Sequence, residues 1–170
     1  MAKKPKASET EAPKDAAPEA PNGPMLQVLA QYTKDLSFEN PNAPDTLRAD
    51  QQPPEVSINI EIARRLLSED TAEVSILLRA DAKRGDQTVF IAELDYAGLF
   101  AFQNMSQEDM QPLIMIECPR ILFPFARQIM CEVTQNGGFP PILLDPPDFP
   151  AMYRDEMMRR AAQIETQGNA

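Results

Sequence analysis

Hydrophobic and polar residues alternate with a period of two along four stretches of the first 102 residues. The clearest stretch is 56–62, where Val and Ile alternate with Ser, Asn and Glu; residues 25–38, 73–81 and 88–102 follow the same period less regularly. This period places successive side chains on opposite faces of a strand, so it predicts four strands. Lys-Arg-Gly-Asp at 83–86 predicts a turn between the last two strands, and therefore a mostly antiparallel sheet.

The period changes to that of a helix after the fourth stretch. Ser106 is a candidate N-cap, with acidic residues in the turn that follows it. Helical spacing continues to a cap at Gly137, with a restart expected at Pro119 and a kink at Pro124. A last helix is predicted over residues 151–164. Four strands followed by helices indicate an α+β fold, a four-stranded antiparallel sheet with helices packed on one side. Its other face is left to water or to a partner.

Composition shifts along the chain predict its organisation. Residues 1–24 contain no Leu, Ile, Val or aromatic residue, so we expect a disordered head followed by one domain over 25–164 and a polar, flexible tail at 165–170. Two proline-rich segments, 39–55 and 139–150, predict long irregular loops, because proline removes backbone donors and restricts the residue before it. Such a long loop inside a compact domain is usually functional or disordered.

The composition excludes several kinds of site. The chain has 170 residues, a net charge of −10 and no histidine. The acidic balance argues against nucleic acid and anionic membranes, and the missing histidine excludes Ser-His-Asp triads, His bases and His-ligated metals. Two cysteines make neither a disulfide framework nor a four-Cys zinc site, so we expect a reducing cytoplasm, no metal and no cofactor. No apolar run approaches the length of a membrane span.

Three carboxylates near strand ends are the first candidates for function. Asp35 and Glu39 lie four residues apart, and Glu93 lies in the fourth strand. They could act as general acid and base, but a hydrolase would need a carboxyl pair whose pKa values are driven apart in a cleft. A solvated acidic face is the favoured interpretation, and a binding patch for a basic partner is the intermediate one.

Aromatic and aliphatic residues on the proline-rich loops are the second candidates. Any single one is best explained as a core residue. Loops lie at the surface, however, so the group as a whole indicates an adaptable apolar surface that binds apolar segments. The loop residues concerned are Leu47, Phe139, Ile142, Leu143, Leu144 and Phe149.

Three long strings resemble the SecB family of bacterial export chaperones. They are YTKDLSFENPNAP at 32–44, CPRILFPFAR at 118–127 and GGFPPILLDPPDFPAMY at 137–153, and the resemblance covers about residues 26–160. It implies a dimer of dimers that hydrolyses nothing. It also implies a cytoplasmic holdase for unfolded secretory preproteins, which hands them to the SecA ATPase of the translocon. The alternative is an oligomeric adaptor that binds one specific partner through an acidic sheet face.

The resemblance also implies site residues. SecA would dock, through its basic zinc-holding tail, on an acidic sheet surface formed by Asp35, Glu39, Ile91 and Glu93. The contact between dimers would use the opposite face of the same strand, at Ala92, Leu94 and Tyr96. The client groove is expected to be lined by apolar residues of the loops, the fourth strand and the helices: Leu47, Phe100, Phe102, Met110, Leu113, Phe123, Phe125, Phe139, Leu143 and Phe149.

Overall fold

The computed structural model describes residues 23–48 and 50–168. In chain order the elements are β1 (Met25–Glu39), η1 (Asp45–Leu47), β2 (Glu55–Leu66), β3 (Thr71–Arg84), β4 (Gln87–Gln103), α1 (Gln107–Pro112), η2 (Leu113–Glu117), α2 (Cys118–Asn136) and α3 (Phe149–Gly168). The predicted disordered head lies outside the described residues except at its last two positions. The predicted tail is wrong in its first part, because α3 continues to Gly168.

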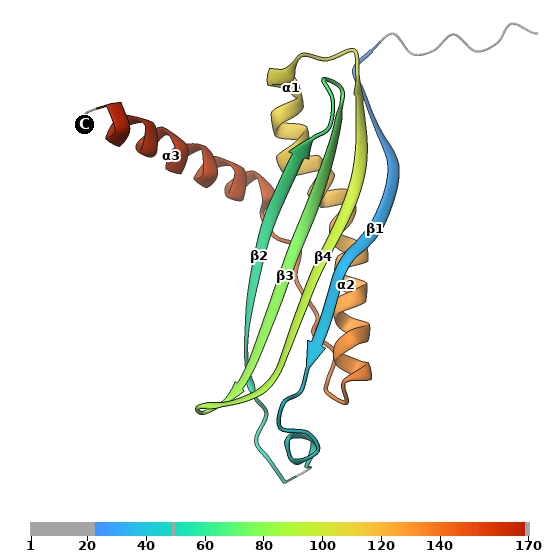
Figure 1. The fold of residues 1–170 in the computed structure, drawn as a ribbon, viewed down its shortest axis with the longest axis vertical. Coiled ribbons are helices and arrows are strands. Elements are labelled where there is room, and N and C mark those ends of the chain that lie inside the picture. Colours follow the sequence, from blue (N-terminus) through green and yellow to red (C-terminus); the bar gives the residue numbers. More distant parts are fainter. Residues whose placement is uncertain (1–22, 49, 169–170) are drawn as a thin grey trace, which may run out of the picture.

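The four strands form one antiparallel sheet, as predicted, and their order in the sheet is β1-β4-β3-β2 (Figure 1). The turn of the β3–β4 hairpin is shorter than predicted, because Arg84 still pairs with Gln87 and only Gly85 and Asp86 remain unpaired. Gly85 has a φ of 59°, a value that glycine adopts without a steric penalty. The loop over 40–54 carries the chain from one edge strand, β1, to the other, β2.

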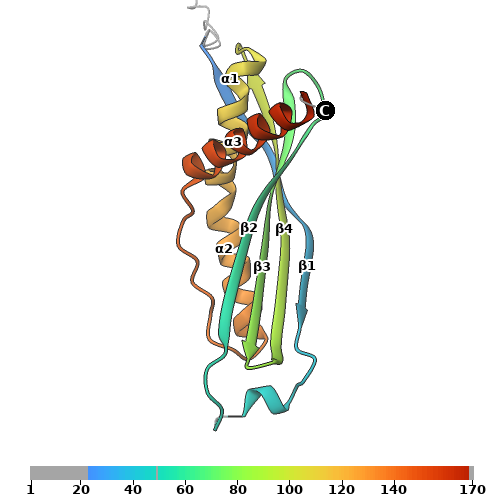
Figure 2. The ribbon, with the colours of Figure 1, turned by 90° about the vertical axis from the view of Figure 1, so that its left-hand side faces the viewer.

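A nearly continuous helical column, α1, η2 and α2, runs along one face of the sheet (Figure 2). The helix α3 departs from the prediction, since it projects away from this layer beside β2 (Figure 1). Its first residue, Phe149, is buried, whereas residues 157–162 are exposed. Charged residues crowd the second and third turns of α3, so only its beginning has apolar side chains to pack.

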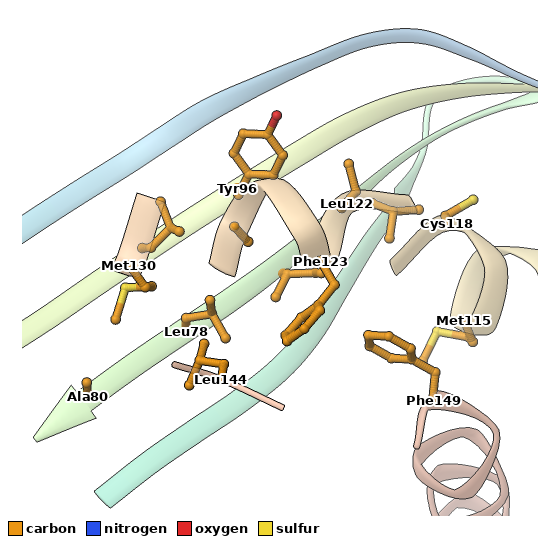
Figure 3. Packing of buried hydrophobic residues seen from close by; sticks show 14 of the residues in the cluster. Leu78, Ala80, Tyr96, Met115, Cys118, Leu122, Phe123, Met130, Leu144 and Phe149 are labelled. Atoms are coloured by element: carbon orange, nitrogen blue, oxygen red, sulfur yellow. The ribbon is translucent and has the colours of Figure 1, made fainter. Parts of the chain in front are cut away.

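The core lies between this column and the two central strands. Alternate residues of β3 and β4 are at most 8% exposed, from Ala72 to Ala82 and from Phe90 to Phe102. They meet Leu122, Phe123 and Met130 of α2 (Figure 3). The rings of Phe123 and Phe149 meet edge to face, with centroids 6.1 Å apart. The helix approaches the sheet closely at Gly98, where a Cβ atom would lie 2.8 Å from Leu122 Cδ2 of α2.

The helix boundaries confirm the predicted cap at Ser106, the restart beside Pro119 and the cap at Gly137. Ser106 caps α1, because its Oγ accepts a hydrogen bond from the Asp109 N–H at 3.2 Å. The restart expected at Pro119 is confirmed, because α2 begins at Cys118 with Pro119 in its first turn. The preceding turn widens into η2, which fits a proline that cannot donate to that turn. Pro124 lies within α2 without interrupting it.

Gly137 caps the end of α2, as predicted, and Gly138 follows it in the left-handed conformation. Gly137 has an ordinary φ of −71°, and the positive φ of 86° belongs to Gly138. Gly137 is required for another reason, since a Cβ atom there would lie 2.2 Å from the Phe38 ring. Within the described part of the chain, no helix combines the length and apolar character needed to cross a membrane.

Candidate functional site

Two bulges in β1 decide which of its side chains reach the uncovered face of the sheet. The register with β4 shifts at Leu29 and again at Lys34. Residues opposite each other in a ladder share a face, so Tyr32, opposite Ala97, lies on the uncovered face. Residues 26–32 therefore do not keep the single alternation expected from sequence, because each bulge exchanges the faces of the residues that follow it. Beyond Lys34, Asp35 faces away from the helices.

The four predicted docking residues share this uncovered face. Glu39 lies opposite Ile91 in the β1–β4 ladder, and Asp35 lies opposite Asp95, two residues from Glu93. Ile91 and Glu93 are both partly exposed. The structure therefore brings these residues of β1 and β4 together as one acidic surface.

Arg79 of β3 is the basic group within this surface. It donates two hydrogen bonds to Asp81, at 2.7 Å and 2.8 Å, and it also pairs with Glu93. The bonds from Arg79 hold the pKa of the Asp81 carboxyl below its usual value. A hollow of about 370 Å³ lies beside these groups. Its lining residues are Asp35, Asn59, Glu61, Leu77, Leu78, Arg79, Glu93, Leu94 and Asp95.

A buried carboxylate, Glu73 of β3, connects both edge strands across the uncovered face. Its side chain is 5% exposed and lies 2.7 Å from Lys34 Nζ of β1 and 2.7 Å from Arg65 Nη2 of β2. Lys34 is the residue at the second bulge, which turns its side chain toward the uncovered face. Hydrogen bonds from Lys34 and Arg65 hold the pKa of Glu73 below its usual value, against the opposing effect of burial. In the sequence, Glu73 stands directly before the apolar run of β3, and this acidic residue was not recognised as a candidate for the site.

An apolar groove of about 380 Å³ opens on the opposite side of the molecule, beside the helical layer. One wall is the end of the 40–54 loop and the start of β2, the other is the loop after α2, and Phe90 contributes from β4. The lining residues are Pro53, Pro54, Val56, Ile58, Phe90, Phe139, Pro140, Pro141, Ile142, Leu143 and Leu144. The Phe90 ring lies 4.7 Å from Phe139 and 5.4 Å from Phe38, measured between centroids, so stacked aromatic rings support the floor.

The structure divides the ten predicted groove residues. Phe139 and Leu143 line the groove, and Leu143 is 69% exposed. Leu47 is 46% exposed and lies near its end, where its Cδ2 would be 3.1 Å from a Cβ atom on Gly138. Leu113 is half-buried and Phe125 is half-exposed, and neither lines this groove.

Five of the predicted groove residues are core residues instead. Phe100, Phe102, Met110, Phe123 and Phe149 are each at most 3% exposed. Phe100, Met110 and Phe149 lie under or within the helical layer and offer no surface to a client, which corrects that expectation for them. Phe102 lines a hollow before α1, and Phe123 lines one of about 380 Å³ that it shares with Leu143. Sequence analysis missed the β2 wall, because its residues look like those of any strand with one buried face.

The structure also limits which of the residues predicted for the subunit contact can reach a second chain. Ala92 and Leu94 are at most 2% exposed, since their face of β4 lies under α2. They belong to the core of the protomer and present no side chain to a second chain, which corrects their assignment. Tyr96 is 8% exposed and stacks on the half-exposed Phe125 at a centroid distance of 6.3 Å. Apolar exposure on this side continues along β1, where Leu36 is 44% exposed.

The described residues include no cluster suited to a metal ion, and the Cys118 thiol is buried. No group of three or more His, Cys, Asp or Glu among the described residues could hold a metal ion. Cys118 is buried, and burial raises the pKa of its thiol to about 12, which keeps the unreactive protonated form.

Comparisons with known proteins place these features in a family. The family model described as "Preprotein translocase subunit SecB" matches residues 19–160. The protein-export protein SecB of Maricaulis maris is 49% identical over 164 residues, covering 94% of this chain and 95% of the relative. The SecB of Rhodopseudomonas palustris strain BisB5 is 52% identical over 148 residues, covering 87% of this chain and 94% of the relative.

A solved structure shares the fold. A SecB-like chaperone of Mycobacterium tuberculosis, solved in complex with a peptide from an antitoxin, superimposes with a TM-score of 0.59 at 17% identity. The match covers 72% of this chain and 90% of that one.

The buried carboxylate gives a test by pH. Because the folded state lowers the pKa of Glu73, its contribution to stability is complete above the unfolded pKa of about 4.5 and is lost as the pH falls through the folded pKa. We expect Glu73→Gln to lower the free energy of unfolding by about 1–3 kcal/mol at pH 7, and this difference to shrink toward pH 3. Urea titrations across pH measure it, with the exposed Glu69→Gln as control. Equal stability of the Glu73→Gln variant and the native chain at pH 7 would contradict the account.

Proposed function

Because the chain belongs to the SecB family, we propose that it is a cytoplasmic protein-export chaperone that holds unfolded secretory preproteins and delivers them to the SecA ATPase. The family is a family of chaperones and not of enzymes. The observation that carries the proposal is the apolar groove between β2 and the loop after α2. It is an open apolar surface beside a sheet edge, which suits an extended chain with exposed apolar side chains.

The groove supplies the binding energy in two ways. Apolar contact returns roughly 25 cal/mol for each Å² removed from water. Among the described residues the edge strand β2 pairs with β3 alone, so its outer backbone groups can bond an extended segment as an added strand. Neither interaction reads a particular sequence, which suits a chaperone for many clients. The peptide bound to the distantly related M. tuberculosis chaperone is consistent with this use of the fold.

Several grooves would act together in an oligomer. We propose a homotetramer, a dimer of dimers, in which the exposed apolar residues of β1 and Phe125 of α2 are covered by neighbouring chains. Leu36 and Phe125 are 44% and 50% exposed, and β1 offers a fifteen-residue edge. Several weak grooves on one assembly raise avidity by roughly 10²–10⁴ without a single tight site.

The uncovered sheet face is the proposed docking surface for SecA. Asp35, Glu39, Ile91 and Glu93 lie there, on the side of the sheet away from α2. A basic partner would be attracted to this acidic surface, and zinc would belong to the partner's tail. Client and SecA would therefore use different surfaces and could be bound at the same time.

The groove assignment predicts a selective loss of client binding. We expect Leu143→Ser to weaken binding of a permanently unfolded, carboxymethylated protein about tenfold, because an exposed groove leucine loses its contact. Fluorescence anisotropy measures the affinity. Leu67→Ser is the matched control, since Leu67 is 48% exposed but lies outside the groove. Equal affinity of the Leu143 variant and the control would refute the groove.

The proposed docking surface predicts a variant that loses SecA binding and keeps client binding. Glu93→Lys should abolish binding of the SecA tail peptide while client holding stays intact, because the substitution reverses a charge on the uncovered face and leaves the groove unchanged. Calorimetric titration with the zinc-loaded peptide measures docking, and Glu69→Lys provides the charge-matched control. Lost client binding with normal docking would show that the two surfaces have been assigned in reverse.

A further inference from the structure

The loop from β1 to β2 is poorly tied to the sheet by its own backbone. Its backbone hydrogen bonds among the described residues stay within 40–48. Pro53 and Pro54, the last loop residues before β2, have no N–H to donate. Yet this end of the loop forms one wall of the apolar groove. Something other than the backbone must therefore hold that wall in place.

Asn42 ties the first part of the loop to β4, because its Nδ2 donates to the Thr88 carbonyl oxygen at 2.9 Å. Arg84, the last residue of β3, ties the end of the loop that forms the groove wall. Its Nε donates to the backbone oxygen of Gln52 at 2.7 Å, and its Nη1 donates to the side-chain oxygen of Gln51. The Gln51 amide nitrogen in turn donates to the backbone oxygen of Asp45 at 3.0 Å. The hairpin tip and the loop lie at the same end of the sheet, as this chain of bonds requires (Figure 1).

This chain of bonds joins one wall of the groove to η1, which lies near the start of the other wall. Gln52 directly precedes Pro53 and Pro54. Asp45 begins η1, which ends at Leu47, and Leu47 lies close to Gly138, where the opposite loop starts.

The opposite wall has an anchor of its own. The Ile142 N–H donates to Oγ1 of the fully buried Thr134 at 3.2 Å, and the Thr134 hydroxyl bonds the Met130 carbonyl of α2 at 2.9 Å. The loop after α2 is thus held to that helix through the Thr134 side chain, and the end of the 40–54 loop is held to the sheet through the Arg84 side chain.

We propose that Arg84 is a positioning residue that holds the 45–54 loop against the β3–β4 hairpin and thereby sets the affinity of the groove for apolar segments. The proposal rests on the groove function proposed above. A wall that is already ordered need not be ordered when the client binds, so the bonds of Arg84 reduce the entropy cost of binding. Lysine cannot replace it, because a single ammonium group on a flexible stem does not present the planar fork that meets Gln51 and Gln52 together.

The test compares Arg84→Ala and Arg84→Lys with Arg48→Ala. Arg48 lies in the same loop, and among the described residues its side chain bonds Asp50 alone, at 3.4 Å. We expect both Arg84 variants to bind a carboxymethylated, unfolded protein about threefold to tenfold more weakly, with Arg48→Ala unchanged. Amide exchange should accelerate over residues 45–52 and stay unchanged in the paired parts of β3 and β4. This local signature distinguishes positioning from a general loss of stability.

Each other result has a defined meaning. If Leu143→Ser weakens client binding while the Arg84 variants do not, the groove stands and the role of Arg84 is refuted. If the Arg84 variants weaken binding but exchange accelerates across the whole sheet, Arg84 supports the fold and the proposal is also refuted. If neither Leu143→Ser nor the Arg84 variants change the affinity, the groove itself is wrongly assigned. Gln51→Ala removes one of the two bonds from Arg84, and it serves as the test if Arg84→Ala does not fold.

Discussion

A single helix is too narrow to cover a four-stranded sheet, and the surfaces of this protein follow from that mismatch. A helix with side chains is about 10 Å across, whereas four strands spaced about 4.8 Å apart are wider. The column that contains α2 therefore buries the central strands, whose facing residues Leu78 and Leu94 are each 2% exposed. The edge strands keep apolar side chains in water, with Ile58 on β2 at 38% and Leu36 on β1 at 44%.

The two exposed margins have different surroundings. The exposed apolar side chains of β2 are bordered by the proline-rich loops, which complete a groove. The exposed apolar side chains of β1 lie instead at an open sheet edge next to Phe125. The first arrangement suits a flexible extended chain, and the second suits a rigid surface of the same kind on another subunit. The uncovered face of the sheet is polar and is connected through Glu73, which pairs with Lys34 and Arg65. Client holding, assembly and docking can thus occupy three separate surfaces of one small domain.

The sequence predicted the elements well and the site only partly. Strict alternation over 56–62 predicted a strand, and the bounds of all four strands came close. Alternation shows that one face is apolar but not how wide the covering layer is. It therefore could not show that Ile58 stays 38% exposed while Phe100 is fully buried. The bulge at Lys34 also has no signature in the hydrophobic pattern. The four residues proposed for docking do share one face of the sheet, because alternation along β4 and the β1–β4 register both place them there.

The most direct test of the account is the native mass of the purified protein, alone and after a denatured secretory precursor is diluted into it. The account predicts a free mass near four times 19.0 kDa that rises by the mass of one precursor, which stays soluble. A monomer, or an oligomer that leaves the precursor to aggregate, would contradict it. The chain would then keep the fold of the family without the holding function, and an adaptor that binds one partner through its acidic face would be the better explanation.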